Sequence, residues 1–167
     1  MLIRNEEKKD KIAVRAVNAA AFETTAEAEL VDALRVQAHP IISLVAEENG
    51  EIIGHIMFSP VSLEGHPNLK AMGLGPLAVI PEHQRESTGA ALVRAGLERC
   101  KEQGFDAVVV LGHPLYYPAF GFLPSTRFGI NCEYDVPAEA FMALELQPGT
   151  LDGKTGIIKY HPAFSNV

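Results

Sequence analysis

The sequence predicts an α+β fold, in which helices pack on a mixed β-sheet. The N-terminal part has two helical patterns followed by a hairpin, an order that a doubly wound parallel sheet does not have. The later part has one strand–helix–strand unit, with Leu77–Ile80 before the helix and the apolar run Ala107–Leu111 after it. Strands joined in this way lie parallel, with a right-handed crossover. We therefore expect a mixed sheet with helices packed against it.

The N-terminal part is expected to form a short strand, two helices and a hairpin. The expected elements are strand 2–4, a helix over 11–22 capped by Asp10, a second helix from Thr24 or Thr25 to before His39, and strands 42–46 and 52–61. An aspartate side chain can accept hydrogen bonds from the free N–H groups that begin a helix. Asn49-Gly50 tolerates the positive φ angles of a tight turn, which predicts that the last two strands pair as a hairpin.

The C-terminal part alternates between strands and helices. The expected elements are a strand over 70–80, a helix over 88–103, strand 107–111, a strand over 130–134, a short helix over 137–144 with Pro137 at its start, and strand 156–160. Gly73, Gly75 and Pro76 interrupt the first of these strands, and this predicts a bulge or a close approach of another backbone. The run 107–111 is apolar throughout, as is typical of a central strand buried on both faces.

The turn Gln84–Gly89 is the strongest candidate for a binding site. It lies between a strand and a helix, where backbone N–H groups have no intrahelical partner and the helix dipole is positive. Such a turn binds phosphate oxygens, and Gly89 lets a ligand approach the backbone closely. The turn has neither the Gly-Lys-Ser/Thr of a P-loop nor the Gly-x-Gly-x-x-Gly of a dinucleotide site. On its spacing alone, a plain strand-to-helix connection is the favoured explanation.

Composition narrows the classes of function. The chain has 167 residues, which predicts one domain over 1–167, and a net charge of −7 that argues against nonspecific nucleic-acid binding. No apolar run approaches the roughly 20 residues that span a bilayer, and the first residues lack a signal-peptide core, so a cytoplasmic protein is expected. Cys100 and Cys132 are isolated and predict no disulfide. The six histidines show no metal-ligand spacing, so no metal is expected.

Two motifs together resemble the GCN5-related N-acetyltransferase (GNAT) superfamily. Gln84, Ser87 and Gly89 occupy the three places of its Arg/Gln-x-x-Gly-x-Gly/Ala turn, with Ser87 replacing the first glycine. This replacement requires a negative φ at Ser87. The segment Tyr117–Phe122 resembles the family's Tyr-x-x-x-Gly-Phe, and the order of elements agrees from Leu2 to Phe122. The tail from Gly129 onward resembles the YhbS-like branch of predicted acetyltransferases.

The resemblance implies the fold, the cosubstrate and the way in which it binds. The implied fold is the acyl-CoA N-acyltransferase fold, a central mixed sheet of six or seven strands with one splayed, bulged strand and helices on both faces. The implied cosubstrate is acetyl-CoA, with the pantetheine arm beside the bulged strand, the pyrophosphate on the turn, and the thioester oxygen on the N–H near Leu77. The residues implied to contact the cofactor are Leu77, Ala78, Val79, Gln84, Arg85, Glu86, Ser87, Thr88, Gly89, Ala90 and Tyr116.

The resemblance also implies acetyl transfer to an amine, with Tyr117 protonating the departing thiolate. For Tyr116 and Tyr117 an ordinary half-buried aromatic is the alternative interpretation. Related enzymes often carry a glutamate before the turn, but Gly73 stands near that place here. His113 is the candidate base because an imidazole titrates near neutral pH, and a structural histidine is the alternative. Water, or an amine that arrives neutral, would also serve.

The acceptor remains open at this point. The resemblance implies acceptor walls from 22–37 and 122–134, with acidic residues that suit a cationic small-molecule or peptide amine or else form a solvated face. These acidic residues are Glu23, Glu27, Glu29, Glu133 and Asp135. No nucleic-acid or membrane partner is expected, and a homodimer is plausible because tail strands often pair between subunits in similar proteins. Two alternatives to an enzyme are an acyl-CoA-binding or sensing module and an α+β interaction domain that binds no CoA.

Overall fold

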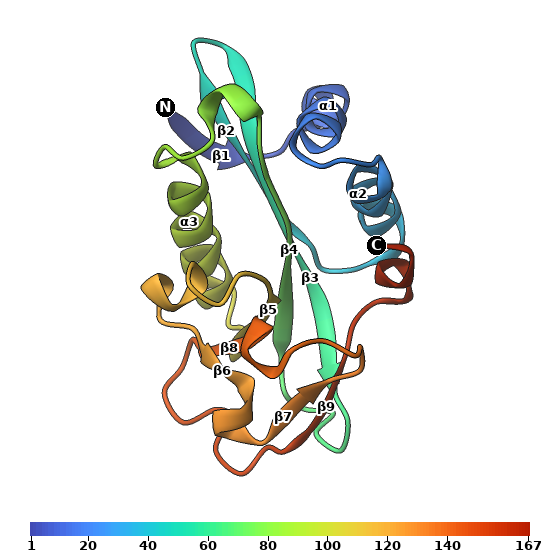
Figure 1. Ribbon diagram of the computed structural model, residues 1–167, viewed down its shortest axis with the longest axis vertical. Coiled ribbons are helices and arrows are strands. Elements are labelled where there is room, and N and C mark those ends of the chain that lie inside the picture. Colours follow the sequence, from blue (N-terminus) through green and yellow to red (C-terminus); the bar gives the residue numbers. More distant parts are fainter.

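A mixed β-sheet with helices on both faces forms the framework of the protein (Figure 1). The computed structural model describes residues 1–167, apart from the side chain of Asn166. The helices are α1 (Lys11–Ala21), α2 (Ala26–Gln37) and α3 (Thr88–Glu102). The strands are β1 (Leu2–Asn5), β2 (Ile42–Glu48), β3 (Glu51–Leu63), β4 (Ala71–Val79), β5 (Ala107–Leu111), β6 (Leu123–Pro124), β7 (Ile130–Cys132), β8 (Phe141–Glu145) and β9 (Gly156–Lys159).

The strand order combines a long antiparallel part with one parallel pair. The main order is β1-β2-β3-β4-β5-β8-β6, in which β4 and β5 are parallel and the other neighbours are antiparallel. These seven strands correspond to the six or seven that were expected, and β7 and β9 bring the whole sheet to nine strands. The far end of β3 also pairs with β9, which in turn pairs with β7. The helix α3 connects β4 to β5, so the predicted strand–helix–strand unit is confirmed.

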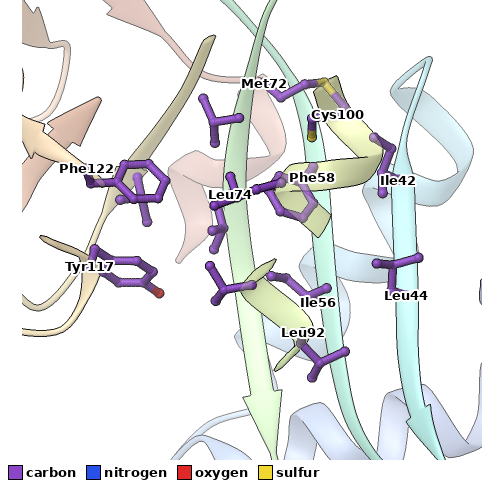
Figure 2. Packing of buried hydrophobic residues seen from close by; sticks show 14 of the residues in the cluster. Ile42, Leu44, Ile56, Phe58, Met72, Leu74, Leu92, Cys100, Tyr117 and Phe122 are labelled. Carbon is purple, nitrogen blue, oxygen red and sulfur yellow. The ribbon is translucent and has the colours of Figure 1, made fainter. Parts of the chain in front are cut away.

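Alternating side chains of β2 and β3 explain why helices cover both faces. Leu44 and Ile56 pack with α3, whereas their chain neighbours Val45 and Met57 pack with α1 and α2. Successive residues of a strand point to opposite faces, so these apolar runs bury two faces at once. Figure 2 shows the α3 side, where Phe58 lies under the helix. A Cβ at Gly96 would come within 2.2 Å of the Phe58 ring, so the helix needs a glycine there.

Two expectations for local structure are wrong. The segment 137–144 is not a helix; a short 3₁₀ turn (Ala138–Ala140) leads into β8, which pairs along the whole of β5. The composition of this segment favours a helix. It forms a strand instead, because the buried edge of β5 would otherwise lack hydrogen-bond partners. Asp10 precedes α1 but makes no capping hydrogen bond to it. Its carboxylate instead accepts hydrogen bonds from the Arg4 guanidinium and from the backbone N–H of Glu7.

Candidate functional site

The two parallel strands β4 and β5 separate part-way along their length. Their pairing runs from Ala71 opposite Ala107 to Leu74 opposite Val110 and ends there. At this point β4 has one extra residue relative to β3, since Leu74 and Leu77 face Phe58 and Ile56. Gly75 has a φ of +156°, which a residue with a side chain rarely adopts. The predicted bulge is confirmed, and it opens a gap beside the second half of β4.

The backbone of Leu77 and Val79 faces this gap. The N–H of Ile80 donates to the carbonyl of Ile53 on β3, at 3.0 Å. Because backbone groups alternate in direction along a strand, the N–H groups of Leu77 and Val79 point away from β3. The backbone N–H and C=O of Ala78 point toward β3, so they take part in the β3–β4 pairing. On the open side, the Gln84 side chain donates to the carbonyl of Val79 at 2.8 Å, which ties the turn to the strand.

The turn after β4 presents a set of free backbone donors. Within the part of the chain that the structure describes, no protein group accepts a hydrogen bond from the N–H groups of residues 85–90. The helical hydrogen bonds begin with the N–H of Ala91, which donates to Ser87 at 2.9 Å. Ser87 has a φ of −84°, so the condition for serine in place of glycine is met. Arg85 has a φ of +64° and is exposed, as are Gln84, Glu86 and Ser87.

The two tyrosines that follow β5 have different places. Tyr117 is 8% exposed, and its ring lies where a side chain at Gly112 would be, within 2.4 Å of that Cβ. Burial raises the pKa of Tyr117 to about 12, so it is a neutral phenol near neutral pH. Figure 2 shows its ring next to β4, with Phe122 nearby. The Tyr116 hydroxyl lies against Gly89 at the start of α3, 3.1 Å from the place of a Cβ. Burial also raises the pKa of Tyr116.

His113 lies in the exposed turn after β5 and is not among the residues that line the cavity described below. Its Nδ1 accepts a hydrogen bond from the N–H of Leu115 at 3.1 Å. Its role as a base stays a prediction. Gly73, near the place of the family's glutamate, is buried, and a Cβ there would come within 2.9 Å of the Tyr160 ring.

A cavity of about 480 Å³ lies where β4 and β5 separate. Its floor includes Leu74–Leu77, Val110 and Tyr117. Its walls come from three other parts of the chain: Phe22, Glu27 and Leu30 near α1 and α2, Tyr134 and Val136 before β8, and Tyr160, Phe164, Ser165 and Val167 at the C-terminus. The first two groups lie in or next to the expected acceptor walls. The C-terminal group was missed, because nothing in its sequence indicates that it folds back onto β4.

Most of the chain matches one known protein family. Residues 7–122 match the Acetyltransferase (GNAT) family. The chain belongs to this family. It is 36% identical to the uncharacterized N-acetyltransferase YhbS of Escherichia coli over 166 residues, which cover 99% of each protein. It is 38% identical to a second E. coli protein, the uncharacterized N-acetyltransferase YjhQ, over 88% of this chain and 86% of that protein.

Two solved structures of GNAT proteins share its fold. The crystal structure of E. coli YhbS in complex with CoA aligns with a TM-score of 0.93, at 35% identity over 98% of this chain and 91% of that one. A GNAT family acetyltransferase from Brucella melitensis in complex with acetyl-CoA aligns with a TM-score of 0.80, at 37% identity over 98% and 97%. The fold prediction is therefore confirmed. Among the described residues, no helix is both long enough and apolar enough to cross a membrane.

Proposed function

We propose that this protein transfers the acetyl group of acetyl-CoA directly to an amine of a small molecule or peptide. One observation carries the proposal: β4 loses its pairing with β5 after Leu74, so the N–H groups of Leu77 and Val79, which point away from β3, face the gap beside the cavity. The pantetheine arm would lie in this gap as an added strand lies beside a sheet edge. The structures of YhbS with CoA and of the Brucella protein with acetyl-CoA support the same cosubstrate here.

The free donors of residues 85–90 would bind the pyrophosphate. Backbone N–H groups at a helix N-terminus, together with the helix dipole, favour an anion without any lysine. The Tyr116 hydroxyl lies against Gly89. It would therefore contact the same end of the cofactor. The side chain of Gln84 is engaged with Val79, so its contribution would be to hold the turn against β4.

The proposed reaction is the direct attack of an amine on the thioester, assisted by the groups around them. The nitrogen of a neutral amine attacks the thioester carbon, and the N–H of Leu77 would stabilise the charge on the oxygen. The C–S bond then breaks. The nitrogen loses one proton, which neutralises the charge of the departing thiolate. With its pKa near 12, the Tyr117 phenol holds its proton more tightly than a thiol of pKa about 8.5. Tyr117 would therefore donate a hydrogen bond to the departing sulfur, while the net proton comes from the amine.

Release of free thiol from acetyl-CoA tests the proposal. With a panel of amines, we expect thiol release that depends on both the amine and the protein. CoA alone should raise the melting temperature, since a ligand that binds only the folded state stabilises it. A CoA-dependent shift without transfer to any amine would indicate an acyl-CoA-binding module. The absence of both signals would contradict the cofactor site as well.

A further inference from the structure

We infer that the acceptor is a small primary amine attached to a flat apolar group, and that Glu27 binds its ammonium, which loses one proton to water before the neutral nitrogen attacks the thioester. This inference rests on the proposed function, because it assigns the acceptor side of the same cavity. It goes beyond an unspecified amine, since it states the charge, size and polarity of the molecule. Three features of the cavity carry it: a wall of aromatic rings, a single acidic side chain, and a C-terminal segment that covers the place where β4 leaves β5.

Aromatic side chains form one continuous wall of the cavity. The rings of Tyr134 and Tyr160 stack with centroids 6.0 Å apart and planes 30° apart, and Phe164 packs on Tyr160 at 5.1 Å. Tyr160 is buried, and no described residue forms a hydrogen bond with its hydroxyl. Flat apolar groups suit this wall, because aromatic rings attract one another in stacked and edge-on arrangements.

Glu27 provides the only acidic side chain among the described residues that line the cavity. It lies in the first turn of α2 and is half-buried. Its one hydrogen bond among the described residues comes from the Thr24 hydroxyl, at a long distance of 3.5 Å. Among the described side chains, no lysine or arginine forms an ion pair with it. A carboxylate without a cationic partner, beside aromatic rings, suits an ammonium ion.

The other acidic residues of the expected walls are engaged elsewhere or exposed. Glu133 accepts a hydrogen bond from the N–H of Tyr160 and lies 3.7 Å from the Lys159 ammonium. Glu29 is exposed, and its carboxylate accepts a hydrogen bond from Thr25 at 3.3 Å. The described side chains that line the cavity therefore include one acidic group, Glu27. A polyamine would leave further ammonium groups against apolar walls, which is costly.

The C-terminal 3₁₀ turn (Pro162–Asn166) limits the length of the acceptor. Phe164 lies 3.7 Å from the place of a Cβ at Gly75, so its ring covers the point where β4 and β5 separate. Ser165 is the one described hydroxyl-bearing aliphatic residue that lines the cavity. With few polar groups on the walls, the main chain of a peptide would lose its hydrogen bonds to water without replacement. A cavity of about 480 Å³ has the size of a small-molecule site.

Steady-state acetylation of three probes tests the inference: phenethylamine, spermidine and a hydrophilic hexapeptide with one free amine. We expect kcat/KM for phenethylamine to exceed the other two values by at least about 10-fold. Glu27→Gln should raise KM for phenethylamine by about 10-fold, because it removes a charge-assisted hydrogen bond, while the CoA-induced melting shift stays unchanged. Glu29→Gln, on the exposed side of the same helix, is the matched control and should leave KM unchanged.

The outcomes separate this inference from the proposed reaction. Faster acetylation of spermidine or of the hexapeptide than of phenethylamine would overturn the acceptor class and leave the reaction intact. Equal effects of Glu27→Gln and Glu29→Gln would overturn the role of Glu27. If phenethylamine is not acetylated, calorimetry measures whether it binds to the CoA-bound protein. Binding without acetylation would overturn the reaction but support the acceptor pocket, and absence of both binding and acetylation would overturn the pocket.

Discussion

Acidification should weaken the fold through one buried histidine. His55 on β3 is 0% exposed and lies between Asn18 of α1 and Ser43 of β2. The Asn18 amide nitrogen donates to the carbonyl of Val14 and approaches His55 Nδ1 at 3.1 Å, so Nδ1 must accept. The proton is then on Nε2, which donates to Ser43 Oγ at 2.8 Å. The Ser43 hydroxyl in turn donates to the carboxylate of Glu6 at 2.9 Å.

This arrangement binds a neutral imidazole and leaves no place for a second proton. Burial, together with the charge of Arg35, lowers the pKa of His55 from 6.5 to about 3. The unfolded chain takes up a proton below pH 6.5, whereas the folded protein does not until about pH 3. Stability is therefore complete above pH 6.5 and is lost as the pH falls. Linkage gives a loss of about 2 kcal/mol between pH 7.5 and pH 5. That is a substantial part of the roughly 5–15 kcal/mol that holds a domain folded.

Urea unfolding at pH 7.5, 6 and 5, followed by circular dichroism, measures this loss. His55→Gln removes the titrating group, so its free energy of unfolding should change much less with pH, whatever its value at pH 7.5. His113→Gln alters an exposed histidine and should keep the full pH dependence. Asp10 does not interfere, because hydrogen bonds from Arg4 lower its pKa to about 2 and place its titration below this range. An equal loss of stability in wild type and His55→Gln would refute the argument.

Three further substitutions test the core and the proposed site. Gly96→Ala should lower the free energy of unfolding in urea by about 1–2 kcal/mol. The new Cβ would lie 2.2 Å from the Phe58 ring, and this overpacking outweighs the roughly 1 kcal/mol gained in helix propensity. A stabilised variant would contradict this. Gly89→Asp should abolish the CoA-induced rise in melting temperature, since its carboxylate would meet the pyrophosphate beside Tyr116, and an unchanged shift would argue against the cradle. Tyr117→Phe should lower kcat by about 10²-fold with the CoA shift retained, because it removes the hydrogen bond to the departing sulfur, and full activity would remove Tyr117 from the mechanism.

The sequence predicted those parts of the site that depend on local signals. Gly75 and Pro76 break the strand pattern, since proline has no N–H for the ladder and Gly75 adopts a φ that other residues avoid. The turn from Gln84 to Gly89 follows from the same kind of short-range pattern. These features depend little on tertiary contacts, because glycine and proline themselves determine which backbone conformations and hydrogen bonds are allowed.

Features that depend on distant contacts could not be predicted in this way. The segment 137–144 has a helix-favouring composition and becomes a strand only because β5 needs a partner. Asp10 has the residue type of a helix cap, but Arg4 on β1 binds its carboxylate. Phe164 lies against Gly75 although the two are far apart in the chain, and no periodic pattern records such a contact.

Gly73 connects the missing base to the shape of the acceptor cavity. From the sequence it is the place where a glutamate is absent, which weakens the case for catalysis. In the structure, a Cβ at Gly73 would come within 2.9 Å of both the Tyr160 ring and Val61. A glutamate there would displace the ring that joins Tyr134 to Phe164. The aromatic wall and a carboxylate on β4 thus exclude each other. The acidic side chain of the cavity therefore lies on another wall, where Glu27 is the one among the described residues.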